Sequence, residues 1–183
     1  PRKSPLDCFV VSLLSSGYFT ARLQGCGIRV DEMKMGRAIG NILSLFRIAA
    51  TIRREKPNII QSWLYHADLM ATLALLLSGR IRKTRLFWGV RCSDMDTRHY
   101  RITLKFAIWA CSKLSRIPDG IIANSHAGMS VHKSLGYNSG NFFVIPNGVD
   151  TNRFAPDADL RREVRRELNI PEDSFAITMV ARR

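Results

Sequence analysis

The sequence predicts an α/β fold with a doubly wound parallel sheet, and three observations carry this prediction. Apolar runs of strand length alternate with helical patterns along most of the chain. Gly or Pro separates these segments at most junctions. The 183 residues are 46% hydrophobic and 23% charged, which provides one full core and argues against disorder. Such alternation places helices on both faces of a parallel sheet.

Three strands are expected in the first third of the chain, where apolar or β-branched runs have the length of buried strands. They span Cys8 to Leu14, Ile28 to Met33, and Asn58 to Ser62. A Gly-Cys-Gly turn at residues 25–27 introduces the second of them.

A helix is expected between the second and third strands. Its apolar residues recur at three- and four-residue spacing. They are Ile39, Ile42, Leu43, Phe46, Ala49 and Ala50. Arg53 and Arg54 fall in the last turn, where cations interact favourably with the helix dipole, and Pro57 ends the helix.

The rest of the chain continues the alternation. The expected helices span His66 to Leu77, Tyr100 to Leu114, and Ala127 to Leu135. The expected strands span Thr84 to Val90, Gly120 to Ala123, and Phe142 to Ile145. After a boundary expected near Pro146 to Pro156, a helix is expected to start at Asp157 or Asp159 as N-cap, and residues 174–180 predict one more strand.

Composition limits the class of protein. The longest apolar run, Leu69 to Leu77, is about half of the ~20 residues that a membrane-spanning helix needs. No signal-peptide pattern opens the sequence. Cys8, Cys26, Cys92 and Cys111 form no C-x-x-C pair, so we expect buried free thiols, no metal site and a cytoplasmic location.

The net charge is +13, and its Lys and Arg residues are spread over several segments rather than gathered in one tail. Such a field attracts nucleic acid, anionic lipid or phosphorylated small molecules, although each cluster alone also fits a solvated face. No nucleic-acid motif is present, so no nucleic-acid partner is expected. The basic segment Tyr100 to Arg116 carries Phe106 and Trp109 and fits either membrane contact or core burial.

The most specific segment is Val-Ile-Pro-Asn-Gly-Val-Asp at residues 144–150, followed by Asn-Arg-Phe-Ala-Pro at 152–156. It resembles the interdomain segment of family-4 retaining glycosyltransferases, which have two Rossmann-like domains. The resemblance implies an acceptor-side domain at residues 1–146 whose first strand precedes Pro1. It also implies a hinge at 147–157 and the start of a nucleotide-sugar domain at 158–183. Pro146, at the end of the first domain, and Asn147, Gly148 and Asp150 are the expected hinge residues.

Ligands of open α/β sheets bind at the carboxyl ends of the strands, which directs attention to three loops. In the first loop, Trp63 and Tyr65 are candidates for a stacking platform and His66 for binding a sugar hydroxyl; core packing and a helix cap are the alternatives. The resemblance favours acceptor binding, with His66 as the catalytic residue. Many family members have histidines where this chain has Gln61 and Trp63.

The second and third loops supply the other acceptor-binding candidates. Arg91 can hold a phosphate or carboxylate, and the resemblance assigns Arg91 and Ser93 to the site; a structural ion pair is the alternative for Arg91. The nearby Asp94-Met95-Asp96 has the D-x-D pattern of metal-dependent transferases, but we interpret it as a surface loop. Asn124 and Ser125 open the next helix, where capping by Ser125 is a sufficient alternative role.

The resemblance implies a reaction in which a sugar moves from a nucleotide-sugar donor to an acceptor hydroxyl with retention, as in polysaccharide or glycolipid synthesis. Arg182 matches the family residue that binds the donor diphosphate. No cofactor or metal is expected. The acceptor would be a sugar or a lipid-linked sugar, reached by peripheral contact with the inner face of an anionic membrane. A non-catalytic domain that binds a sugar, a lipid head group or nucleic acid is the alternative.

Overall fold

A computed structural model describes residues 7–15, 17–35, 42–93, 95 and 100–179 of the chain. The chain forms two compact units, residues 1–146 and 147–183. The division falls between Pro146 and Asn147, where the sequence predicts the end of the first domain. The two units are described separately.

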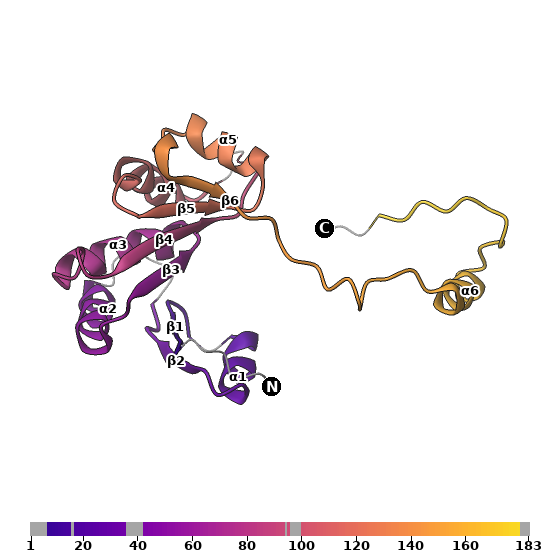
Figure 1. Cartoon of the computed structure of the whole chain (residues 1–183), viewed down its shortest axis with the longest axis horizontal. Coiled ribbons are helices and arrows are strands. Elements are labelled where there is room, and N and C mark those ends of the chain that lie inside the picture. Colours follow the sequence, from indigo (N-terminus) through magenta and orange to yellow (C-terminus); the bar gives the residue numbers. More distant parts are fainter. Residues whose placement is uncertain (1–6, 16, 36–41, 94, 96–99, 180–183) are drawn as a thin grey trace. The chain divides into compact units, whose positions relative to one another are not determined.

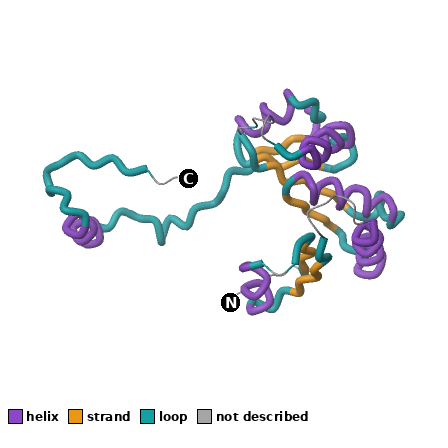
Figure 2. The backbone as a smooth tube through the Cα atoms, turned by 180° about the vertical axis from the view of Figure 1, so that it is seen from behind, coloured by secondary structure: helices purple, strands orange, loops and turns teal. Residues whose placement is uncertain are grey.

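The strands of the first unit are all parallel and form two sheets. The smaller sheet pairs β1 (Phe9–Ser12) with β2 (Arg29–Glu32). The larger sheet has the order β3-β4-β5-β6. Its strands are β3 (Ile59–Trp63), β4 (Arg85–Val90), β5 (Gly120–Ala123) and β6 (Phe142–Val144). Figures 1 and 2 show the two groups of strands apart from each other, with helices alternating between them along the chain.

The helices complete a Rossmann-like α/β unit, which confirms the predicted fold class. They are α1 (Tyr18–Gly25), α2 (Ile42–Glu55), α3 (Tyr65–Leu77), α4 (Ile102–Leu114) and α5 (His126–Ser134). A short 3-10 helix, Ser139–Asn141, leads into β6. Helix α1 is not predicted from the sequence, because its 8 residues are too few to display a helical repeat.

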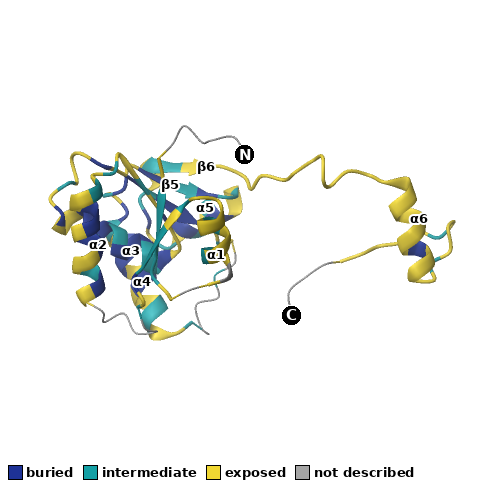
Figure 3. Cartoon of the chain, turned by 90° about the horizontal axis from the view of Figure 1, so that it is seen from below, coloured by how far each residue is buried: buried dark blue, intermediate teal, exposed yellow. Residues whose placement is uncertain are grey.

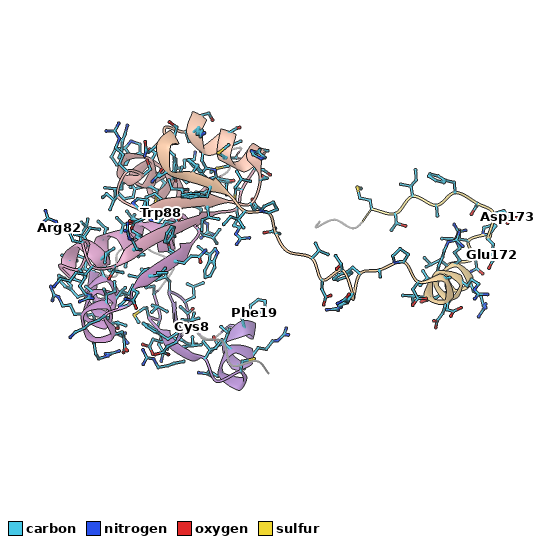
Figure 4. All side chains as sticks on the ribbon, viewed as in Figure 1. Cys8, Phe19, Arg82, Trp88, Glu172 and Asp173 are labelled. Atoms are coloured by element: carbon cyan, nitrogen blue, oxygen red, sulfur yellow. The ribbon has the colours of Figure 1, made fainter. Side chains whose placement is uncertain are left out.

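The core lies where β4 and β5 meet α3 and α4. Trp88, labelled on β4 in Figure 4, is fully buried, and its indole Nε1 donates to Thr72 Oγ1 at 3.1 Å. Leu75 of α3, Cys111 of α4 and Ile121 of β5 are equally buried. Each large apolar side chain buried in this way stabilises the fold by about 1.5–3 kcal/mol, so this region contributes much of the stability of the sheet that carries the loops.

Helix α2 buries only part of the apolar pattern that predicts it. Ile42, Leu43 and Phe46 are exposed. Figure 3 shows both exposed and buried parts on this helix. The buried residues are Ser44, Ile48, Ala49, Thr51 and Ile52. The helix packs on α3, and Arg53 Nε donates to the carbonyl of Ser78 at the end of α3, at 3.2 Å. The three- and four-residue spacing therefore predicts the helix correctly, but tertiary packing decides which face is covered.

The prediction of buried thiols is wrong for two of the four cysteines. Cys111 is buried and Cys92 partly buried, but Cys8 and Cys26 are exposed (Figure 4 labels Cys8). Cys8 directly precedes the short edge strand β1, and Cys26 lies in the turn after α1, so neither is covered by a second layer. All four are free thiols.

The second unit contains α6 (Ala158–Glu167), and the predicted N-cap is confirmed. Asp157 Oδ1 accepts hydrogen bonds from the amides of Asp159 and Leu160, both at 2.9 Å. Arg165 is nearly buried and donates to the Ser174 carbonyl at 2.8 Å, which ties the following turn to the helix. The predicted strand is absent over residues 174–179, because the described part of this unit offers no strand to pair with it.

Candidate functional site

Three loops meet at the carboxyl edge of the larger sheet, because β3, β4 and β5 are parallel neighbours. The amide of Leu64, after β3, donates to the Gly89 carbonyl of β4 at 3.3 Å. The Trp63 ring lies so close to Gly89 that a Cβ there would be 2.6 Å from Trp63 Cδ1. Glycine at position 89 therefore lets Trp63 lie against the backbone of β4.

Helix α3 starts with a backbone conformation that is unusual for its residue. Leu64 has φ 72° and ψ 153°, outside the regions that a branched L-residue prefers, and no side chain caps the helix. Trp63 and Leu64 are both about half exposed, at 51% and 54%. Strained non-glycine residues of this kind are concentrated at functional sites, so the first turn of α3 is a candidate binding position.

Tyr65 is a core residue and does not share a platform with Trp63. It is 4% exposed, and its hydroxyl donates to His132 Nε2 of α5 at 2.9 Å. Met95 Sδ lies 3.1 Å from the same hydroxyl. Burial raises the pKa of Tyr65 above its ordinary value, so the hydroxyl stays protonated. Tyr65 thus joins the start of α3 to α5 and to the loop after β4.

His132 is a fully buried residue that the analysis of strand ends did not assign to the site. Its Nδ1 lies 2.7 Å from the Gly128 carbonyl, which can only accept, so Nδ1 carries the proton and Nε2 accepts from Tyr65. Burial lowers the pKa of His132, which keeps the ring neutral at pH 7. Both ring nitrogens are therefore satisfied, and His132 acts as a fixed support.

Asp68 is the second buried titratable residue behind the loops, and sequence reasoning also missed it. It is 0% exposed, and Ser62 Oγ donates to its Oδ1 at 2.6 Å. Its Oδ2 has no hydrogen-bond partner among the described residues. Burial raises the pKa of Asp68 to about 7, and hydrogen bonds from the Ser62 hydroxyl and the Gly89 backbone oppose this only in part. A lone carboxyl in the otherwise apolar α3 is the sequence signal that could have identified it.

The remaining candidates of the first two loops lie at the surface of the edge. His66 is the second residue of α3 and is half-buried, and burial lowers its pKa, so it is a neutral donor and acceptor at pH 7. Arg91 and Ser93 follow β4 directly and are exposed. Asp94 and Asp96 of the D-x-D pattern lie outside the described residues.

The third loop combines a helix cap with an unsatisfied acceptor. Ser125 Oγ accepts from the Gly128 amide at 3.0 Å, so it caps α5. Asn124 Oδ1 is buried and has no hydrogen-bond partner within the described part of the chain. A Cβ on Gly128 would lie 3.3 Å from the Cys92 carbonyl, which shows how closely the second loop approaches α5. Asn124 thus presents an acceptor where the second and third loops meet.

The structure therefore brings most predicted acceptor-site residues to one edge of the sheet. These are Trp63, His66, Arg91, Ser93, Asn124 and Ser125. Tyr65 lies beneath them. Arg182 lies outside the described residues. Within the described ranges, no group of three His, Cys, Asp or Glu residues is placed to hold a metal ion.

The predicted hinge residues Pro146, Asn147, Gly148 and Asp150 are all exposed. Asp150 Oδ1 accepts from the amides of Asn152 and Arg153, both at 3.1 Å, and its carbonyl accepts from the Phe154 amide at 2.9 Å. Asp150 thereby orders the turn that follows the boundary between the units.

Comparison with known proteins identifies the family. The family model described as Glycosyltransferase Family 4 matches residues 11–153, most of the chain. The chain belongs to glycosyltransferase family 4. No curated protein matches it.

Three solved structures, all of Anabaena Alr3699/HepE, share the fold. The complex with UDP has a TM-score of 0.68 at 19% identity. The complexes with UDP and glucose and with UDP-glucose each have a TM-score of 0.65 at 18% identity. Each match covers 87% of this chain but only 42% of the Anabaena chain. This member of the family therefore spans less than half the length of the structures that it resembles.

Proposed function

We propose that this chain is the acceptor-side domain, the hinge and the start of the nucleotide-sugar domain of a retaining, metal-independent glycosyltransferase. The observation that carries the proposal is Asn124 Oδ1, a buried acceptor that has no hydrogen-bond partner among the described residues. It follows β5 at the carboxyl edge of the sheet, next to the Arg91 loop after β4, in a chain of glycosyltransferase family 4. Open α/β sheets bind ligands at this edge. A hydroxyl of the acceptor or a water held with it would complete the hydrogen bonding of Asn124.

The donor of the proposed reaction is a nucleotide sugar. The Anabaena structures are described as complexes with UDP and UDP-glucose, which supports this class of donor. The bond from the anomeric carbon to the diphosphate oxygen breaks, and a bond from the same carbon to the acceptor oxygen forms. The hydroxyl proton goes to the departing phosphate. Arg182 would stabilise the diphosphate, a kind of electrostatic stabilisation often worth several kcal/mol of barrier.

Each predicted residue at the carboxyl edge of the larger sheet has a proposed role in binding the acceptor. Neutral His66 orients the reacting oxygen of the acceptor, and Asn124 accepts a hydrogen bond from a neighbouring hydroxyl of the acceptor or from a water, so the reacting proton is left for the phosphate. The half-exposed Trp63 offers an aromatic face to a sugar ring. Arg91 pairs with an anionic group of the acceptor, and Ser93 and Ser125 line the pocket. The reaction needs no strong enzymic base, because the leaving phosphate takes the proton.

The acceptor is proposed to be lipid-linked, as in polysaccharide or glycolipid synthesis, and helix α4 supports this. Ile102, Phe106 and Trp109 are exposed on one side of α4, so the membrane alternative of the sequence analysis is favoured over core burial. Lys105 and Lys113 are also exposed on this helix. Aromatic side chains beside lysines suit the surface of an anionic bilayer. No helix in the described ranges is long and apolar enough to cross a membrane.

A vesicle assay tests the proposed contact between α4 and an anionic membrane. We expect the chain to sediment with anionic vesicles and not with neutral ones, and Phe106→Ser with Trp109→Ser to abolish this. The paired control Ile81→Ser removes an exposed apolar residue that is not on α4. Equal binding to both kinds of vesicle, or binding that survives the double substitution, would contradict the membrane contact.

The catalytic part is tested on the protein from its native source. We expect an intact mass near twice that of this chain, roughly two domains of 100–200 residues each.

In that longer protein, Arg91→Ala should reduce nucleotide release from a nucleotide sugar by about 10²-fold with an unchanged melting temperature. The control is Arg82→Ala, an exposed Arg on the loop before β4, at the opposite edge of the sheet (Figure 4). Wild-type turnover of Arg91→Ala would remove it from the site, and a mass near this chain's own would favour the non-catalytic alternative.

A further inference from the structure

Asp68 joins three elements behind the candidate acceptor site. Ser62 Oγ of β3 donates to its Oδ1 at 2.6 Å, and the backbone of Gly89 in β4 also donates to the carboxyl. The Asp68 carbonyl accepts from Thr72 Oγ1 at 2.7 Å, and Thr72 Oγ1 accepts from the Trp88 indole of β4 at 3.1 Å. Asp68 therefore fastens the first turn of α3 to the carboxyl ends of two neighbouring strands.

Asp68, Leu64 and Gly89 form a closed ring of hydrogen bonds beside Trp63. The Asp68 amide donates to the Leu64 carbonyl at 2.9 Å, and the Leu64 amide donates to the Gly89 carbonyl at 3.3 Å. The Gly89 backbone donates to the Asp68 carboxyl, which completes the ring. Trp63 lies between Ser62 and Leu64 in the chain, and its side chain lies against Gly89. A change at the Asp68 carboxyl therefore reaches Trp63 through both of its chain neighbours and through Gly89.

The first turn of α3 needs such a restraint. Leu64 has φ 72°, and no side-chain hydrogen bond caps the helix. A branched residue keeps this conformation only where the surrounding structure over-determines it. The ring through Asp68 supplies that restraint directly behind Trp63 and His66, which the acceptor is proposed to contact. Hydrogen bonds behind a site fix the side chains in front of them in this way.

The surroundings of Asp68 suit its protonated form better than its ionised form. The side chain is 0% exposed, and Oδ2 has no hydrogen-bond partner among the described residues. Tyr65 of α3, Cys111 of α4 and Tyr137 before β6 are the titratable groups that interact with it. Burial raises the pKa of each of these three groups, so all are neutral at pH 7. The described core therefore offers an ionised Asp68 no cation, and a buried carboxylate without a cation is costly.

We propose that Asp68 is a positioning residue for acceptor binding: its protonated form holds the first turn of α3 so that Trp63 and His66 face the acceptor, and its ionisation loosens that turn. The assignment of the ligand rests on the proposed function, whereas the restraint on Trp63 does not. The rival is a purely structural carboxyl, which stabilises the core without controlling Trp63. The two roles differ in whether Trp63 responds when Asp68 loses its proton.

The experiment follows fluorine NMR of the 183-residue chain labelled with 5-fluorotryptophan, between pH 5 and pH 9. The chain has three Trp residues, and Trp→Phe substitutions assign their resonances. Because the pKa of Asp68 is about 7, we expect the Trp63 resonance to shift with a midpoint near pH 7. In Asp68→Asn, whose side chain is neutral at every pH, it should stay at its low-pH position. Trp109, exposed on α4, is the internal control and should not follow this titration.

Two further variants identify the titrating group. His66→Gln removes the nearest histidine in the sequence, and the Trp63 titration should survive it. Ser62→Ala removes a hydrogen bond that favours the ionised carboxylate, so the midpoint should move to higher pH. A Trp63 resonance that does not titrate, or that titrates equally in Asp68→Asn, would overturn the proposal. Loss of the titration in His66→Gln, or an unchanged midpoint in Ser62→Ala, would also overturn it.

This measurement needs neither donor nor acceptor, so it separates the positioning role from the proposed reaction. If Trp63 titrates through Asp68 but the longer protein transfers no sugar, the proposed function fails and the restraint on Trp63 stands. If the longer protein transfers sugar and Trp63 does not respond to Asp68, the positioning role alone is refuted.

Discussion

Helices α3 and α5 begin at the same edge of the sheet, but their first turns are built in opposite ways. Helix α5 starts from the extended residue Ser125, whose hydroxyl caps the Gly128 amide at 3.0 Å. Helix α3 starts from Leu64 with φ 72° and no side-chain cap. One start is stabilised by its own residues, and the other is strained.

The buried groups behind the two turns repeat this difference. His132 of α5 is neutral and uses both ring nitrogens, whereas Asp68 of α3 has one oxygen without a partner in the described structure. Tyr65 connects the two helices through its hydrogen bond to His132. The comparison teaches that α5 supplies a stable support, while α3 carries the strain and the unsatisfied group next to Trp63 and His66, as expected of a functional site.

The largest expected effect concerns Asp68. Its pKa is 3.8 in an unfolded chain and about 7 in the fold. Below pH 3.8 Asp68 is protonated in both the folded and the unfolded state, so it does not reduce the free energy of unfolding. As the pH rises toward 7, Asp68 ionises first in the unfolded state, and the free energy of unfolding falls. Asp68→Asn removes this loss, so it should stabilise the protein at pH 8 by on the order of 4 kcal/mol and by little at pH 4. Urea unfolding at the two pH values measures this.

The control for that experiment is Asp7→Asn, which removes an exposed carboxyl just before β1. It should unfold like the wild type at both pH values. If the difference between wild type and Asp68→Asn is the same at pH 4 and pH 8, the carboxyl does not bind a proton on folding. The contrast between the two helices would then be reduced to the strain at Leu64.

The next largest effect on stability is expected at His132, the buried support in α5. His132→Ala deletes a fully buried ring and leaves the Tyr65 hydroxyl and the Gly128 carbonyl without their partner. A cavity of this kind with unpaired polar groups costs about 3 kcal/mol of unfolding free energy. Urea unfolding at pH 8, where His132 is neutral in both states, isolates the packing contribution. His126→Ala, an exposed histidine at the start of the same helix, should change stability by less than about 0.5 kcal/mol; equal losses for the two variants would show that α5 is not fixed through His132.

The sequence predicts the fold well because local patterns determine where strands and helices lie. Every strand of the first unit falls within or next to a predicted apolar run, and β5 (Gly120–Ala123) matches its prediction residue for residue. Tertiary structure decides what the local patterns leave open. The strand expected from Ser174 is absent because it needs a neighbouring strand that the described second unit lacks, and the face that α2 buries depends on packing against α3.

The site is less predictable, because its supports are pairs of residues far apart in the sequence. The topology rule correctly places Trp63, Arg91 and Asn124 at one edge. No local pattern reveals that Tyr65 and His132, 67 residues apart, form a buried hydrogen bond. That contact turns Tyr65 from a predicted surface aromatic into a core residue, and whether the exposed residues bind an acceptor stays a prediction.

The smallest effect compares the two helix starts directly. Leu64→Gly relieves the unfavourable φ of 72° but adds freedom to the unfolded chain, so it should stabilise the protein by about 1 kcal/mol. Ser125→Ala removes the cap of α5 and should destabilise it by about 1 kcal/mol. Chemical unfolding at one pH measures both changes. The two substitutions act at helix starts on the same edge of the sheet, so opposite signs of the stability change would establish that α3 stores strain where α5 does not. A loss of stability in both variants would mean that favourable contacts hold Leu64. The start of α3 would then be as well supported as that of α5.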